Sequence, residues 1–151
     1  MTAGEYEAWM SAELVHYAAD LAGSGAFDEA EAQRQAEQQH RELLPDGRAT
    51  PHMHLLRVLD DRGEPVGVLW VGPHPRKAGA GWVWDVEIDE AHRGRGHGRA
   101  AMLAAEEIAR SEGWAELGLN VFGPNRRAKA LYDSLGYEVV STSMTKPLSP
   151  G

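Results

Sequence analysis

The stretch that most constrains the fold is residues 82–109, where a strand, a glycine-rich turn and a helix are predicted in succession. An apolar run of β-branched and aromatic residues ends at Ile88 and predicts a strand. The turn Arg93–Arg99 carries glycines at positions 94, 96 and 98, and a segment rich in Ala, Leu and Met follows with helical spacing. The start of such a helix presents free backbone N–H groups, which glycines leave accessible and arginines surround with positive charge. The sequence therefore predicts an anion-binding turn.

The remaining patterns predict alternating helices and strands. Helices are expected over residues 6–21, 28–44, 97–111 and 125–135, and strands over 53–59, 65–71, the run ending at 88, 114–121 and 137–145. Asp28 is the expected cap of the second helix, and Gly136 that of the last. Short links make the first three strands antiparallel, whereas the helical crossover makes the strands on either side of it a parallel pair. We expect one mixed α/β domain over residues 1–151.

Composition excludes several classes of function. The net charge of −8 disfavours nucleic-acid binding and suits a cationic acceptor such as an amine. The absence of cysteine excludes a thiol nucleophile, and the seven histidines show no zinc-binding spacing, so no metal is expected. No apolar run reaches the length of a membrane span, and we expect a cytoplasmic protein that does not bind membranes.

Two motifs resemble those of the GNAT superfamily of acetyl-CoA-dependent N-acetyltransferases. The first is a basic residue followed by x-x-Gly-x-Gly, here Arg93, Gly96 and Gly98. The second is Asn-x-x-Ala-x-x-Leu-Tyr-x-x-x-Gly-Tyr, and it stands here as Asn125, Ala128, Leu131, Tyr132, Gly136 and Tyr137. One predicted strand separates them, and the resemblance covers about residues 53–146. The strand that opens many relatives has no counterpart in residues 1–4.

The resemblance implies a fold, a cosubstrate and a set of site residues. The fold would be a central mixed sheet, with antiparallel N-terminal strands, a parallel pair at the acyl-CoA site and helices on both faces. Acetyl-CoA would pair its pantetheine arm with the backbone of Val86, Glu87 and Ile88, and Asn125 would bond the same region. Its pyrophosphate would lie on the turn formed by Arg93, Gly94, Arg95, Gly96, His97, Gly98 and Arg99.

The implied reaction is direct transfer of the acetyl group to a primary amine, with no covalent enzyme intermediate. A backbone N–H near Ile88 could stabilise the tetrahedral oxyanion, and Tyr132 could protonate the departing thiolate. An alkyl ammonium titrates near ~10.4, so a base must take its proton at neutral pH. The glutamate that serves in relatives acting on protein N-termini is replaced by Asn120, which cannot be a base.

Asp85 and Glu87 are therefore the candidate bases. Strand alternation places them on one face, opposite Trp84, Val86 and Ile88. Of the two, Glu87 is expected closer to the thioester and Asp85 one pleat further back, where it would mainly bind the acceptor. The alternative is that these carboxylates point to solvent or pair with an arginine. His54 could line the acceptor cleft or be an ordinary surface histidine.

Other classes explain the glycine turn less well. Residues 96–101 match a dinucleotide fingerprint, but the chain lacks room for a Rossmann sheet, and no Lys-Ser/Thr follows as in a P-loop. A non-catalytic acyl-CoA sensor on the same fold is the main alternative, although it would not need Tyr132. The sequence leaves open whether the acceptor is a polyamine, an aminoglycoside, an amino acid or a protein amine. It also leaves open a homodimer.

Overall fold

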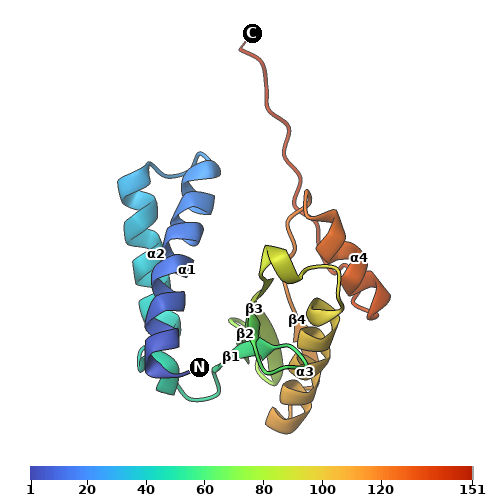
Figure 1. The fold of residues 1–151 in the computed structure, drawn as a ribbon. Coiled ribbons are helices and arrows are strands. Elements are labelled where there is room, and N and C mark those ends of the chain that lie inside the picture. Colours follow the sequence, from blue (N-terminus) through green and yellow to red (C-terminus); the bar gives the residue numbers. More distant parts are fainter. Residues whose placement is uncertain (151) are drawn as a thin grey trace. The chain divides into compact units, whose positions relative to one another are not determined.

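The computed structural model describes residues 1–150 and divides the chain into two compact units, Met1–Leu119 and Asn120–Gly151. The first unit opens with two helices and continues with a sheet and a third helix (Figure 1). Its elements are α1 Ala3–Gly23, α2 Glu29–Leu43, β1 His54–Leu59, β2 Pro65–Pro73, β3 Ala80–Ile88, α3 His97–Glu112 and β4 Glu116–Gly118. The expectation of a single domain over the whole chain stays a prediction.

Local signals account for where the first two helices begin. Thr2 and Glu5 form a capping box at α1, in which each side chain accepts a hydrogen bond from the other residue's backbone N–H. Asp28 accepts from the N–H of Glu31 at 2.8 Å, so the predicted cap of α2 is confirmed. The buried positions of α2 are Ala32, Ala36 and His40, which form one narrow seam on an otherwise polar helix.

The sheet has the order β1-β2-β3-β4, with antiparallel β1–β2 and β2–β3 pairs and a parallel β3–β4 pair. This confirms the predicted mixed sheet. The last strand of this unit is shorter than the predicted 114–121, because β4 pairs with β3 only from Ala80↔Glu116 to Trp82↔Gly118. Beyond Trp82, the β4 side of β3 therefore has no strand partner within residues 1–150.

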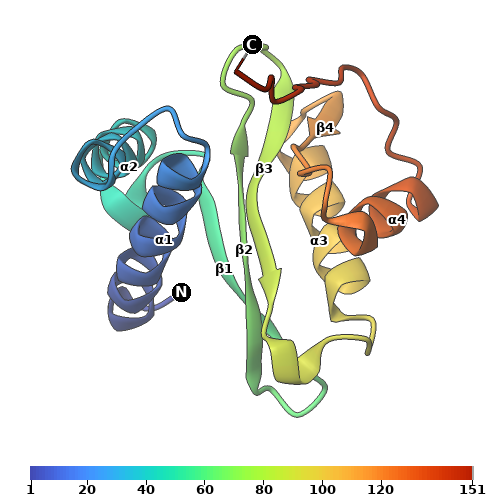
Figure 2. The same ribbon diagram turned by 90° about the horizontal axis from the view of Figure 1, so that it is seen from above.

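Helices cover both faces of the sheet, as predicted (Figure 2). On one face α1 and α2 pack over a core that is rich in tryptophan, made of Trp9, Leu44, Leu55, Val68 and Trp70. On the other face lies α3, whose buried positions are Ala101, Met102, Ala105 and Ala109. Small alanines let α3 approach the strands closely, so β2 is buried along most of its length.

The second unit contains α4, Arg126–Ser134, and a C-terminal segment. Gly136 follows the helix with φ +91°, the left-handed geometry expected of a terminating glycine. The prediction of a strand over residues 137–145 is wrong, because the segment has no strand partner among the described residues. Val139 and Val140 are 63% and 97% exposed, so the apolar pattern that suggested a strand is not buried.

Candidate functional site

The glycine turn has the open geometry that the sequence predicts. Gly94 and Gly96 have φ angles of +77° and +86°, which side chains with a Cβ rarely adopt. Gly96 is the N-cap of α3 and supplies no side-chain hydrogen bond to the helix. A Cβ built at Gly96 would meet nothing within 4 Å, so the space beside the helix N-terminus is open. The turn can therefore receive an anion on the first N–H groups of α3.

Arg93 connects this turn to the end of β3. Its Nε donates to the carbonyl of Ile88 at 2.9 Å, which fixes the chain where it leaves the strand. Beside the turn lies a polar cavity of about 630 Å³ shared with the β1–β2 hairpin. Its lining comprises Asp60, Asp61, Arg62, Glu64, Pro65, His92, Arg95 and His97. No sequence signal links the hairpin to the turn, which follows it about thirty residues later.

The unpaired edge of β3 leads toward the glycine turn. Residues 83–88 continue the strand after the β3–β4 pairing has ended. Backbone groups on that edge can pair with an extended ligand, as an added strand would. This is the stretch to which the resemblance assigns the pantetheine contacts, and it is continuous with the glycine turn.

A β-bulge changes which side chains of β3 share a face. Trp70 pairs with Asp85 and Val71 with Val83, so Trp84 is the extra residue. The indole of Trp84 stacks on that of Trp70, with centroids 5.6 Å apart and planes at 27°. The prediction that Trp84 lies opposite Asp85 is therefore wrong, because the bulge interrupts the alternation. Both side chains lie on the α1–α2 face, whereas Val86 lies on the α3 face with its partner Leu69.

Asp85 carries a half-buried carboxyl group between β3 and α1. The indole Nε1 of Trp9 donates to its Oδ2 at 3.4 Å. Burial raises the pKa of Asp85 from 3.8 to about 7; the charges of Glu13 and Glu87 add to this rise, while the Trp9 hydrogen bond and His40 oppose it. Such a group can exchange a proton near neutral pH.

Glu87 shares the face of Asp85, as predicted, since it pairs with Val68. Its side chain is exposed, in contrast to that of Asp85. Within residues 1–150, neither carboxylate forms an ion pair with a basic side chain. Pairing with an arginine, one of the alternatives weighed from the sequence, is thus not observed.

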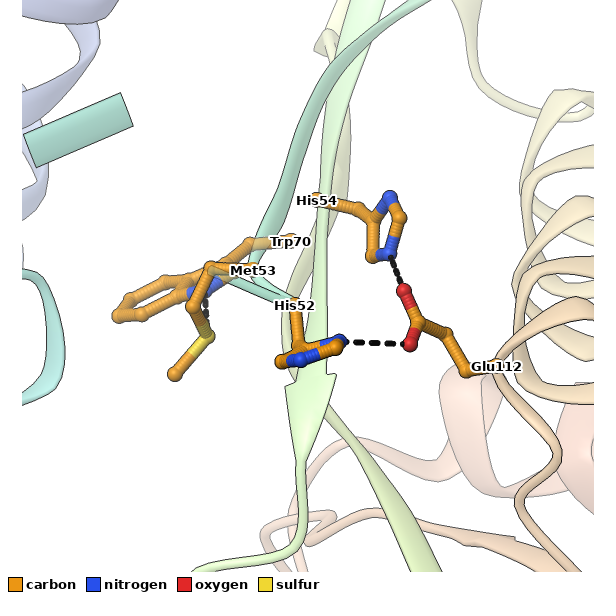
Figure 3. A network of polar contacts seen from close by, with 5 residues as sticks. All are labelled: His52, Met53, His54, Trp70 and Glu112. Carbon is orange, nitrogen blue, oxygen red and sulfur yellow. Dashed lines mark hydrogen bonds and ion pairs between the residues drawn. The ribbon is translucent and has the colours of Figure 1, made fainter. Parts of the chain in front are cut away.

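His54 is engaged elsewhere. His52 Nδ1 and His54 Nε2 donate to the two carboxylate oxygens of Glu112, at 2.8 and 2.7 Å (Figure 3). This contact ties the start of β1 to the end of α3, on the face opposite the Met53–Trp70 contact. His54 pairs with Val71 and so does not lie on the face of Asp85. A role in accepting the amine's proton is not supported by this placement.

In the second unit, Asn125 is the N-cap of α4 and its side-chain oxygen accepts from the N–H of Ala128 at 3.2 Å. Its amide NH₂ group is the part left for a ligand. Tyr132 lies on α4, half-buried, with its ring centroid 6.0 Å from that of Tyr137. The roles of both residues stay predictions.

Comparison with known proteins identifies the class. Residues 13–137 match the acetyltransferase (GNAT) family, and the chain belongs to this family. It is 31% identical to the N-acetyltransferase YycN of Bacillus subtilis (strain 168), over 98% of this chain and 96% of the relative. It is 32% identical to the N-acetyltransferase YdgE of the same organism, over 98% of this chain and 95% of the relative.

Solved structures of other proteins support the same family assignment. The crystal structure of YycN from Bacillus subtilis superposes with a TM-score of 0.86 at 30% identity, covering 99% of this chain and 96% of that one. The aminoglycoside N-acetyltransferase AAC(6')-Iy, solved with a bisubstrate analogue of CoA, shares the fold at 16% identity and a TM-score of 0.57, over 92% and 93% of the two chains. The protein is thus a GNAT-type acyltransferase.

Residues 1–150 show neither a metal-binding cluster nor a membrane-spanning helix. No group of three or more histidine, aspartate or glutamate side chains is arranged to hold a metal ion. None of the helices there combines the length and apolar character that crossing a membrane requires.

Sequence reasoning missed three residues beside Asp85. Trp9, Glu13 and His40 come from α1 and α2, more than forty residues before Asp85. Trp9 and Glu13 fall on the amphipathic pattern of the first helix and His40 on the seam of the second, so each reads as an ordinary helix position. Only the packing of both helices on β3 brings them together.

Proposed function

We propose that this protein transfers the acetyl group of acetyl-CoA to a primary amine by direct attack. The observation that carries the proposal is the continuity of an unpaired β3 edge with an uncapped helix N-terminus at the glycine turn. Together they match the two ends of an acyl-CoA arm, since the edge offers backbone pairing and the turn offers an anion site. Membership of the GNAT family supports the same assignment.

The pantetheine arm would pair with Val86, Glu87 and Ile88, and the pyrophosphate would lie on Gly94–Arg99. Arg93 would hold the geometry of the turn through its bond to Ile88 and add positive charge there. The family motif assigns Asn125 a bond to the pantetheine region and Tyr132 the protonation of the thiolate, and we propose the same roles for them here. The one-domain organisation over residues 1–151 and a homodimer belong to the same proposal.

Asp85 is the residue that we propose as the base, ahead of Glu87. Its burial raises its pKa to about 7, which is the range in which a general base works best at neutral pH. Glu87 is exposed on the same face, and a second carboxylate there would attract the ammonium form of the acceptor. The sequence-based order, with Glu87 as base and Asp85 as binder, is thus reversed in our proposal.

In the reaction the ammonium form of the acceptor gives one proton to Asp85, and the neutral nitrogen then attacks the thioester carbonyl. The tetrahedral intermediate collapses as the carbon–sulfur bond breaks, and Tyr132 gives its proton to the leaving thiolate. The second proton lost by the nitrogen returns to the Tyr132 phenolate, directly or through water. No covalent enzyme intermediate forms and no metal is required. A half-buried, proton-exchanging carboxyl supports catalysis over the alternative of a non-catalytic acyl-CoA sensor.

A panel of amines tests the proposal. Polyamines, aminoglycosides, amino acids and lysine peptides would be incubated with acetyl-CoA and the full-length protein, and release of free CoA thiol would be measured. We expect one class to give turnover, which Asp85→Asn reduces more strongly than Glu87→Gln. If acetyl-CoA does not bind in calorimetry, the assignment of the turn is refuted. Equal turnover in Asp85→Asn and the wild type would refute Asp85 as the base.

A further inference from the structure

Behind Asp85, the two N-terminal helices place a histidine and a glutamate that the reaction described above does not use. His40 of α2 is 6% exposed, and its Nε2 lies 3.6 Å from Glu13 Oε1 of α1. The ring packs against Trp70, with centroids 5.7 Å apart, and Trp70 in turn pairs with Asp85 across the sheet. The three titratable groups thus share one partly buried region between α1, α2 and β3.

The hydrogen bonds of His40 settle which ring nitrogen carries a hydrogen in the neutral ring. Nδ1 lies 2.9 Å from the carbonyl oxygen of Ala36, and a carbonyl only accepts, so Nδ1 carries a hydrogen. The other ring nitrogen is Nε2. That atom is buried without a hydrogen-bond partner in the described structure, and it faces the carboxylate of Glu13.

This arrangement places His40 and Glu13 in direct electrostatic contact. His40 and Glu13 act on Asp85 with opposite sign, because a positive ring favours the ionised carboxylate and a negative Glu13 disfavours it.

We propose that Glu13 and His40 are positioning residues for acetyl transfer, which act on Asp85 in opposite directions and together set the pH range in which it can accept a proton. Neither residue need touch the acceptor amine. The inference rests on the proposed function, since it assigns Asp85 the role of base.

Other charged groups near the cluster are few. Glu87 of β3 and Arg57 of β1 lie on the same face of the sheet, both in register with Val68. Tyr17 of α1 packs on the ring of His40, with centroids 5.4 Å apart, and its hydroxyl donates to Gln39. Burial raises the pKa of Tyr17, so its hydroxyl stays neutral across the range in which Asp85 titrates. Glu13 and His40 are therefore the natural pair to vary.

The test is a titration of Asp85 that needs no acceptor. Carboxyl carbon NMR of the full-length protein would follow Asp85 in the wild type, in Glu13→Gln and in His40→Gln. We expect the midpoint to fall by roughly one pH unit in Glu13→Gln and to rise by a similar amount in His40→Gln, as for the loss of one charge a few ångströms away. Glu7→Gln and His16→Gln change the same charges at exposed positions of α1 and should leave it unmoved.

The proposal would be overturned if the Asp85 titration midpoint did not change in Glu13→Gln and His40→Gln, or if it moved in the same direction in both variants. Glu13 is only partly buried, so Glu13→Gln keeps the test decisive if His40→Gln does not fold. The acid limb of kcat/KM, measured with an amine that turns over, should move with the NMR midpoint. If the midpoints move but the rate profile does not, Asp85 is not the base, and it is the proposed catalytic role that fails.

Discussion

Replacing Asp85 with asparagine should stabilise the protein in a pH-dependent way. The group titrates at 3.8 when unfolded and at about 7 when folded, because burial disfavours its charge. Between these values the native state holds a proton that the unfolded state has lost, so stability falls as the pH rises through this window. A difference of about three pKa units at ~1.36 kcal/mol each corresponds to about 4 kcal/mol. Asparagine does not ionise, so the variant does not lose this unfolding free energy as the pH rises.

The measurement is urea unfolding of wild type and Asp85→Asn, followed by tryptophan fluorescence from about pH 4 to about pH 8. The difference in unfolding free energy should move in favour of the variant by about 4 kcal/mol across that range, and then level off. Glu87→Gln is the control, because it removes the same charge from an exposed position of the same strand; its effect should stay within about 0.5 kcal/mol. A pH-independent difference for Asp85→Asn would show that the carboxyl is not held protonated by burial.

Three further changes test the rest of the site and the fold. Gly96→Asp should abolish acetyl-CoA binding in calorimetry, because it brings a negative charge to the turn. Gly96→Asn has the same shape and backbone cost without the charge, and it should weaken binding much less. Equal losses of affinity in the two variants would argue against an anion site. Tyr132→Phe should lower the rate by about 10²–10⁴ with unchanged acetyl-CoA affinity, and wild-type turnover would make the hydroxyl structural. Hydrogen bonds from His54 and His52 lower the pKa of Glu112, so its contribution to stability is present above 4.5 and lost as the pH falls through the depressed value. Glu112→Gln should therefore cost about 1 kcal/mol near neutrality and nothing in acid, and a constant difference in urea unfolding would contradict this.

Residues close together in the chain were sufficient to predict the glycine turn and most elements of the fold. Glycine spacing, helix caps and hairpin lengths are local properties, so Asp28, Gly96 and the antiparallel strand pairs could be inferred from the sequence alone. The two family motifs lie within short segments for the same reason. A strand, in contrast, forms only where a partner satisfies its backbone, and the apolar segment 137–145 has none among the described residues.

The environment of Asp85 was decided by tertiary structure. Strand alternation predicted that Trp84 would point away from Asp85, but the bulge opposite Trp70 places both on one face. The bulge depends on the pairing of β2 with β3, which no pattern within β3 records. Likewise, the charge of a carboxyl group depends on what surrounds it in space, and here Trp9, Glu13 and His40 come from two helices far back in the chain. The sequence by itself determined that a carboxylate follows Trp84, whereas only the packing of α1 and α2 on the sheet determined that it is half-buried and able to exchange a proton near neutral pH.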